Sequence, residues 1–247
     1  LSLRRQRQMC IRDRSRILSI GAGVMGTAIT IPAVSNGHEA KIVGTSLDEE
    51  IIDSINKNSV HPKLNVQLTN TSALLFNQMT QEDIDNSDVI VIGINSSGID
   101  WFIELIKNFK VVNKKFLIVT KGLYMNEKKE LDIFPNKIKN EIKQDLSLTA
   151  VTGPCKAIEL AKKNLTNICF VNSDLDTAIN LANLFKNDYY VIKSQSDLLG
   201  AELCAALKNV YAIAVGYSQT YFSKEEKIFN PESVSYTHLR AHETSLH

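Results

Sequence analysis

Short apolar runs alternate with amphipathic stretches along most of the chain. Runs this short and this rich in Ile, Val and Leu are typical of strands buried on both faces of a sheet. They cover residues 17–20, 40–44, 88–94, 115–120, 146–152, 168–171 and 190–192. Helical spacing between them predicts helices over 27–34, 48–58, 98–109, 155–163 and 174–185, and residues 61–68 read as a short strand or extended insert. This alternation predicts a doubly wound α/β domain.

The first apolar run ends in a glycine-rich turn at residues 21–26. Gly21 suits the tight turn off the strand, Gly23 lets the backbone approach a pyrophosphate, and Gly26 lets the next helix pack against the strand. The helix that begins near Val24 would then direct its amides at that anion. A turn that merely contains three glycines is the alternative. The strand before it and the helix after it favour a Rossmann-type dinucleotide motif.

The end of the second strand is where the adenine ribose of a dinucleotide would lie. An acidic residue about 20 positions beyond the glycines favours NAD, because it accepts hydrogen bonds from the ribose. This zone holds Thr45 and Ser46, and Asp48 is slightly late and equally suited to begin the next helix. The sequence therefore leaves the cofactor open between NAD and NADP.

Polar residues follow three later strands at the edge where ligands bind in open α/β sheets. The third apolar run leads into Asn95 and Ser96, and the fourth stops at Lys121. Taken alone, Lys121 is equally well read as a solvated strand-end lysine. The fifth run ends at Gly153, and Pro154 suits the first position of a helix that points its N-terminus at the same edge.

A long apolar helix is predicted over residues 196–222, with Ser196 as N-cap. Because it is apolar on nearly all sides, we expect it to be buried. Lys208, followed by Asn209, is the ionisable group in its middle, and an unpaired buried ammonium is costly. Lys208 is therefore the strongest catalytic candidate. The alternative is a lysine that extends out of a helix–helix seam.

Charge and cysteine content narrow the functional classes. The formal net charge is +1, which gives no general electrostatic argument for a nucleic-acid or membrane partner. An Arg-rich head followed by an apolar run has the outline of a signal peptide, but the glycines within that run argue against one. No other stretch approaches the roughly 20 apolar residues of a membrane span. The cysteines show neither metal-ligand spacing nor a disulfide framework. We therefore expect a soluble, cytoplasmic protein without a metal site.

Four motifs, in order, resemble NAD(P)-dependent glycerol-3-phosphate dehydrogenase, a soluble family that interconverts dihydroxyacetone phosphate and glycerol 3-phosphate. They are GAGVMGTA from Gly21, VTKG around Lys121, VTGPCKAIELA around Gly153 and ALKNVYAIAVG around Lys208. The match runs from about residue 16 to residue 222. The first motif is shared by many dehydrogenases, whereas the four together are specific.

The resemblance implies NAD(P)H-dependent, reversible reduction of dihydroxyacetone phosphate, which feeds glycerophospholipid synthesis. It implies that Lys208 is the proton donor or acceptor, that Lys121 contacts substrate and cofactor, and that Asn209 helps to hold the site. The implied cofactor-binding residues are Gly21, Gly23, Val24, Met25, Gly26, Asn95, Ser96, Lys121 and Ala157. The implied substrate-binding residues are Lys121, Gly153, Cys155 and Lys208.

The chain also departs from the family pattern. Cys155 stands where the family usually has Ser or Thr, and a thiol is a weaker hydrogen-bonding group. Asn95-Ser96 stands where Pro-Ser is usual. The family continues into segments that supply an active-site Asp and an Arg-Asn pair for the substrate phosphate, and we expect these to be missing here.

The ends of the chain differ in composition from its body. Both resemble translated sequencing-adapter sequence, with a solvated basic arm and a disordered tail as the alternatives. We expect non-native tails at 1–14 and 233–247, a dinucleotide-binding domain at 15–194, and the truncated start of an all-α substrate domain at 195–232. A fragment of this kind is expected to bind cofactor with little or no turnover. The oligomeric state stays open, a homodimer of the full-length protein being one option.

Two other functions are weighed against this one. A reductase of the 3-hydroxyisobutyrate or ketopantoate type shares the two-domain plan, but such families tend to place Lys and Asn a helical turn apart. Here Lys208 and Asn209 are adjacent. A non-catalytic NAD(P)-binding module would require only the glycine loop, and the presence of both Lys121 and Lys208 argues against it.

Overall fold

The computed structural model describes residues 14–224. Residues 1–13 and 225–247 lie outside this range. They include the expected tail at 233–247 and all of the expected tail at 1–14 except its last residue. Arg14 lies within them and pairs with Glu39 at 2.7 Å.

The described residues form an eight-stranded sheet in the order β12-β11-β10-β7-β6-β1-β2-β5. Its strands are β1 (Arg16–Ile20), β2 (Glu39–Gly44), β5 (Thr71–Leu75), β6 (Val89–Ile92), β7 (Lys115–Ile118), β10 (Ser147–Thr152), β11 (Thr166–Val171) and β12 (Tyr190–Gln195). Every neighbouring pair in this sheet is parallel except β10 and β11, which are antiparallel. The predicted α/β class is confirmed, because helical crossovers join the parallel strands.

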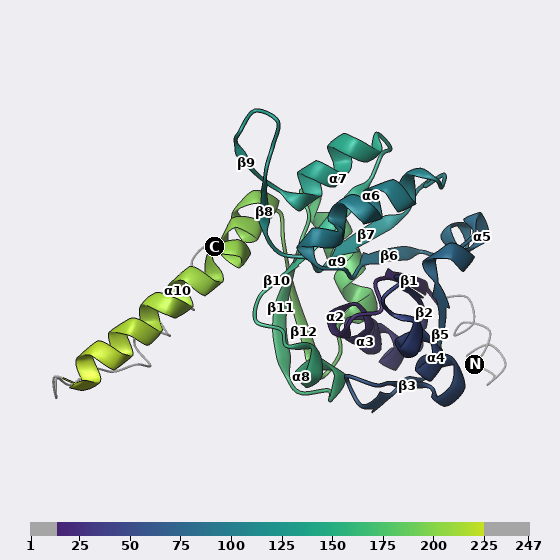
Figure 1. The fold of residues 1–247 in the computed structure, drawn as a ribbon, viewed down its shortest axis with the longest axis horizontal. Helices are drawn as coiled ribbons and strands as arrows, with labels where there is room; N and C mark the ends of the chain where they lie inside the picture. The colour runs from purple at the N-terminus through teal and green to yellow at the C-terminus, as the bar shows by residue number, and fades with distance from the viewer. Residues whose placement is uncertain (1–13, 225–247) are drawn as a thin grey trace, which may run out of the picture.

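Helices cover both faces of this sheet (Figure 1). They are α2 (Val24–Ala28), α3 (Thr30–Ser35), α4 (Glu49–Asn58), α5 (Gln81–Asp85), α6 (Ile99–Lys107), α7 (Phe134–Ile142), α8 (Ala157–Ala161), α9 (Leu175–Phe185) and α10 (Leu198–Lys224), with 3-10 turns η1 (Phe76–Gln78) and η2 (Ser96–Gly98). α6 packs against α7, whereas α2 packs against α8 and α3 against α9. Ile29 joins α2 to α3 without leaving helical backbone angles, at φ −64° and ψ −23°.

The core lies on the two faces of the sheet, and alternate residues of each strand serve opposite faces. In β6, Ile90 and Ile92 pack on the side of α6 and α7, whereas Val89 and Val91 pack with residues of α3 and α9. This two-sided burial explains why the central strands read as continuous apolar runs.

Within residues 14–224, two small hairpins lie outside the sheet. β3 (Val60–His61) pairs with β4 (Val66–Gln67), which confirms an extended insert where residues 61–68 predicted one. β8 (Leu123–Met125) pairs with β9 (Leu131–Ile133) and leads into α7; the sequence pattern did not predict this pairing. The helix expected from residue 155 begins only at Ala157, because Lys156 keeps extended angles of φ −101° and ψ 127°. Pro154 is therefore not at a first helical position.

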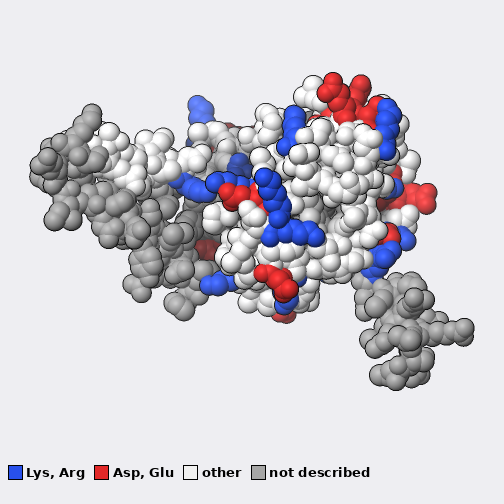
Figure 2. Space-filling model, turned by 90° about the horizontal axis from the view of Figure 1, so that it is seen from below, with Lys and Arg blue, Asp and Glu red and all other residues white. Residues whose placement is uncertain are grey.

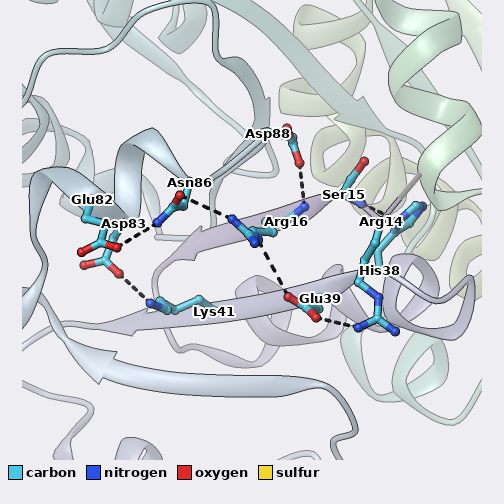
Figure 3. A network of polar contacts seen from close by, with 10 residues as sticks. All are labelled: Arg14, Ser15, Arg16, His38, Glu39, Lys41, Glu82, Asp83, Asn86 and Asp88. Carbon is cyan, nitrogen blue, oxygen red and sulfur yellow. Dashed lines mark hydrogen bonds and ion pairs between the residues drawn. The ribbon is translucent and has the colours of Figure 1, made fainter. Parts of the chain in front are cut away.

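Charged residues hold the sheet at the amino ends of its central strands (Figure 3). The Arg16 amide donates to Asp88 at 2.8 Å, and Lys41 pairs with Asp83 at 2.6 Å. Nδ1 of His38 accepts a hydrogen bond from the Ser15 amide at 3.1 Å. These contacts tie the amino ends of the strands together, whereas Gly21 and Gly153 follow the carboxyl ends of β1 and β10.

α10 leaves the body of the molecule after its first turns and projects beyond it (Figure 1). Leu198 and Ala201 pack against the core, whereas Val210 is 61% exposed and Ile213 73% exposed. The expectation of a buried helix is therefore wrong for the described residues beyond its first turns, most of whose side chains are exposed. The expectation that no stretch approaches a membrane span is also wrong: residues 198–221 meet the criterion of length and composition, as core helices of soluble proteins also do.

Candidate functional site

The carboxyl ends of the central strands are fastened together by backbone hydrogen bonds. Gly21 N donates to Val43 O at 2.7 Å and Gly93 N donates to Ile20 O at 2.8 Å. Parallel strands that end side by side create the edge at which α/β proteins bind ligands. The motifs that follow β1, β6, β7 and β10 are therefore neighbours in space although they lie far apart in the sequence.

The glycine loop after β1 is packed directly against Gly93 at the end of β6. A Cβ on Gly26 would lie 2.3 Å from Gly21 O and 2.8 Å from Gly93 O, and a Cβ on Gly93 would lie 2.6 Å from the Cα of Gly26. Gly21 has a φ of +116°, which L side chains rarely adopt. The predicted roles of Gly21 and Gly26 in the turn and in helix packing are borne out by this geometry. Gly93 was missed, although a glycine inside an apolar strand is a signal of close backbone approach.

Gly23 has a different environment from the other two glycines of the motif. A Cβ built there would meet nothing within 4 Å, so the missing side chain leaves open space in front of the loop. Gly23 precedes α2, and Val24, the first residue of that helix, is 36% exposed. The backbone at the start of α2 is therefore open to the space in front of the loop.

The end of β2 carries a closed turn rather than a free acidic group. Asp48 Oδ2 accepts hydrogen bonds from the amide of Thr45 at 2.9 Å and from its hydroxyl at 2.7 Å. These bonds hold the carboxylate against its own turn at the N-terminus of α4.

The loop after β6 is ordered by its own side chains. The Asn95 side-chain oxygen accepts bonds from Gly98 N at 3.0 Å and from Ser97 Oγ at 2.8 Å. Ser96 begins the 3-10 turn η2 and is exposed. Both predicted cofactor residues, Asn95 and Ser96, thus lie at the carboxyl end of β6, next to the glycine loop.

Lys121 reaches across to the motif at the end of β10. Its Nζ donates to the carbonyl of Gly153 at 3.2 Å, which joins two sequence motifs that lie 32 residues apart. The residue is exposed, yet protein atoms around the ammonium group desolvate it, and this lowers the pKa of Lys121. Repulsion by Lys208 lowers this pKa further, whereas Cys155 and Glu202 oppose the shift.

The turn after β10 brings a thiol beside that ammonium group. Gly153 has a φ of +106°, and a Cβ there would lie 3.2 Å from the Cα of Ile168. Burial raises the pKa of the Cys155 thiol, and attraction to Lys121 partly offsets the rise. Ala157 follows as the first residue of α8, which packs beside α2.

Lys208 and Asn209 lie on the exposed part of α10. The prediction of a buried Lys208 is wrong for the described residues, because the helix has already left the body of the molecule there. Lys208 is nevertheless close enough to Lys121 to repel it. The charge of Lys208 therefore acts on Lys121, the other lysine that the sequence singled out.

Glu202 is a site neighbour that the sequence analysis missed. Its side chain is fully buried, and neither carboxylate oxygen has a hydrogen-bond partner. Burial raises the pKa of Glu202 to about 7, against an opposing attraction to Lys121. An acidic residue in the first turns of an otherwise apolar helix was the available signal.

Known proteins share both this fold and this sequence pattern. An NADP(+)-dependent glycerol-3-phosphate dehydrogenase of Archaeoglobus fulgidus is 31% identical over 208 residues, which cover 83% of this chain and 61% of the relative. A glycerol-3-phosphate dehydrogenase of Mycoplasma mobile, named for NAD(P)+, is 33% identical over 213 residues, covering 82% and 60%. The solved Plasmodium falciparum glycerol-3-phosphate dehydrogenase has a TM-score of 0.73 at 20% identity, covering 86% and 61%.

The family comparison covers the part of the chain that holds the strand-end motifs. The family model described as NAD-dependent glycerol-3-phosphate dehydrogenase N-terminus matches residues 16–178, which is more than half of the chain. The chain spans about 60% of the length of the curated relatives named above. From the glycine loop, the converging strand ends and this match, we conclude that the chain belongs to the NAD-dependent glycerol-3-phosphate dehydrogenase family and carries its N-terminal region.

Proposed function

We propose that this chain is the dinucleotide-binding part of an enzyme that reduces dihydroxyacetone phosphate to glycerol 3-phosphate, reversibly, with NADH or NADPH. The observation that carries the proposal is the hydrogen bond from Lys121 to Gly153, with Lys208 close enough to repel Lys121. Two cations at one edge suit a substrate whose ketone oxygen gains negative charge and whose phosphate is anionic.

The glycine loop supplies the proposed cofactor cradle. Gly23, Val24 and Met25 would present the backbone to the pyrophosphate, while Gly21 and Gly26 hold the loop in shape. Asn95, Ser96, Lys121 and Ala157 are the further cofactor contacts in this proposal. The relatives are named for NAD(P)+ or NADP(+), and the Asp48 turn leaves both cofactors open for this chain.

The proposed chemistry divides between the cofactor and the chain. A bound reduced nicotinamide supplies a hydride to the ketone carbon of the substrate. Lys208 gives a proton from its ammonium group to the resulting alkoxide, and Lys121 stabilises the negative charge on that oxygen. Asn209 helps to hold Lys208, while Gly153 and Cys155 line the substrate side. The products are oxidised cofactor and glycerol 3-phosphate.

The remaining site residues are proposed to lie in a helical domain that begins with α10. We place the dinucleotide-binding domain at 15–194 and the start of the helical domain at 195–232. The share of relatives covered, about 60%, and the exposed apolar face of α10 support this division.

The free thiols of Cys155, Cys169 and Cys204 support a reducing, cytoplasmic location. Assembly of the full-length protein as a homodimer stays an option.

The test is a steady-state assay of the full-length protein with dihydroxyacetone phosphate and NADH or NADPH. We expect cofactor oxidation, and we expect Lys208→Ala to lower kcat by about 10²- to 10⁴-fold, the usual contribution of general acid–base catalysis. Cofactor affinity should be retained in that variant. An unchanged rate in Lys208→Ala would contradict the proposed role of this residue. Cofactor turnover with a hydroxy acid or its keto form, in place of dihydroxyacetone phosphate, would favour a reductase of the 3-hydroxyisobutyrate or ketopantoate type.

A further inference from the structure

The hairpin formed by β3 and β4 lies directly against the glycine loop. The hairpin is closed on itself by Leu68 N donating to Ser59 O at 2.7 Å, and it is tied to α4 by Ser54 Oγ donating to Val60 O at 2.9 Å. Leu64, at its tip, is 2% exposed and belongs to a core cluster that includes Ala28 of α2. The hairpin is therefore a fixed part of the fold on the side of the sheet where the loop lies.

His61 connects this hairpin to the middle residue of the glycine turn. Its side chain is fully buried, and Nε2 lies 3.0 Å from the carbonyl oxygen of Ala22, between Gly21 and Gly23. The other ring nitrogen, Nδ1, accepts the amide of Leu64 at 3.2 Å. The hydroxyl of Thr27 is a longer donor to the same carbonyl, at 3.4 Å.

These two partners fix the protonation state of the ring. A carbonyl can only accept, so Nε2 must carry the hydrogen, and an amide can only donate, so Nδ1 must carry the lone pair. A protonated imidazolium would set two donors, Nδ1–H and Leu64 N–H, against each other. The geometry therefore requires a neutral His61 with a single tautomer.

The surroundings of the ring also disfavour its charged form. Burial is the largest cause of a lowered His61 pKa, and repulsion by Lys63 acts in the same direction. Bonds to the backbone and attraction to Asp48, at the start of α4, oppose the shift. No residue of α2, which packs beside the loop, is charged. His61 is therefore neutral at neutral pH and takes up a proton only in acid.

We propose that His61 is a positioning residue for the dinucleotide: it holds the Ala22 carbonyl back, so that the amides after Gly23 stay turned toward the bound pyrophosphate. Protonation of His61 adds a hydrogen to Nδ1 and sets it against the Leu64 amide, which displaces the ring from the hairpin and so loosens its hold on the Ala22 carbonyl. The inference rests on the proposed cofactor role of the loop, and His61 itself touches no ligand in it.

Three variants separate positioning from a merely structural role. His61→Phe keeps an aromatic ring and removes both hydrogen bonds. His61→Gln keeps an amide donor at the distance of Nε2 but cannot titrate. His38→Phe is the matched control, because His38 also accepts a backbone amide, from Ser15, but lies at the opposite end of the strands (Figure 3).

The measurements are NADH and NADPH affinity of the 247-residue chain at pH 7.5 and at a series of lower pH values, and backbone hydrogen exchange of residues 21–26 without ligand. We expect His61→Phe to bind about tenfold more weakly at pH 7.5 and to exchange faster in the loop, because a buried carbonyl loses its donor. The wild-type protein should lose affinity as the pH falls far enough to protonate His61, His61→Gln should bind with similar affinity across the same pH series, and His38→Phe should behave as wild type.

The contrary outcomes are distinct. Wild-type affinity and loop exchange in His61→Phe, or an equal loss in His38→Phe, would overturn the positioning role while leaving the proposed cofactor site intact. An identical acid loss in His61→Gln would overturn the pH dependence. A folded wild-type chain that binds neither dinucleotide would instead contradict the proposed function, and the inference would fall with it.

Discussion

The three glycines of the loop occupy three different environments. Gly23 faces open space, and Gly26 packs against the backbone of Gly21 and Gly93. We expect Gly23→Ala to fold with nearly unchanged stability, since alanine at this position meets no protein atom. A methyl group should nevertheless obstruct the pyrophosphate, so dinucleotide affinity should fall at least tenfold. Thermal unfolding and a cofactor titration of the same sample check both parts.

Gly26→Ala serves as the matched control for that variant. Its new Cβ would lie within 3 Å of two backbone oxygens, so overpacking should destabilise the fold by about 1–3 kcal/mol or more. Urea denaturation measures this cost. If Gly23→Ala is the less stable of the two, or if it binds dinucleotide as wild type does, the assignment of Gly23 to the ligand side is wrong.

Glu202 should make the stability of the chain depend on pH. Its folded-state pKa of about 7 lies above the ordinary glutamate value, so the native state holds a proton that the unfolded state has lost. Below about pH 4.5 Glu202 is protonated in both states and does not affect the free energy of unfolding. As the pH rises from about 4.5 to 7, ionisation in the unfolded state lowers the free energy of unfolding and so destabilises the native state. The full effect is about 3 kcal/mol above pH 7.

Glu202→Gln removes this titration and isolates the effect. Relative to wild type, the variant should gain stability as the pH rises from 4 to 8, as measured by urea denaturation across that range. A difference between wild type and variant that is constant with pH would show that Glu202 ionises normally.

At the scale of elements, the sequence pattern predicted the central strands well. Strands such as β6 and β7 are buried on both faces, so their apolar runs are unambiguous. The edge strand β5 and the hairpin of β8 and β9 were missed, because partly exposed strands mix polar and apolar residues without a clear period. Local patterns carry little information about such edges.

The site was predicted as far as it depends on motifs at strand ends. Lys121 and Gly153 meet as expected because adjacent parallel strands bring their carboxyl ends together. Glu202 and His61 were not found, since their importance comes from burial and from partners distant in the sequence. Lys208 was expected to be buried because an apolar helix usually is, but the described side chains of α10 are exposed from Leu207 to Ala212.

The projecting part of α10 should promote self-association of the 247-residue chain. Val210 and Ile213 expose apolar side chains on this helix, and exposed apolar surfaces are interaction sites. We expect Val210→Lys combined with Ile213→Glu to shift the chain toward monomer in sedimentation velocity. A wild-type chain that is already monomeric at high concentration, or an unchanged distribution in the variant, would contradict this expectation.

At the scale of the whole molecule, the net charge gives no reason for a cofactor to bind, so we attribute cofactor binding to the carboxyl edge of the sheet. Lys and Arg side chains lie next to Asp and Glu on the face shown in Figure 2, which agrees with a formal net charge of +1. A cofactor must therefore be recognised by local geometry at the carboxyl edge of the sheet rather than by a long-range field. The fold also divides the chain in two: the residues up to the end of β12 build the sheet and its helices, and α10 then leaves them.

The most direct test of the account is a titration of the 247-residue chain with NADH and NADPH. Trp101, the single tryptophan of the sequence, lies in the first turn of α6, the helix that follows the Asn95 loop, and its ring packs edge-on against Phe76 with 5.7 Å between the ring centroids. Energy transfer from Trp101 to the reduced nicotinamide reports binding without any need for turnover. The account predicts saturable binding of one dinucleotide per chain, at least tenfold weaker in Gly23→Ala, with little or no oxidation when dihydroxyacetone phosphate is added. A folded chain that binds neither cofactor would contradict it.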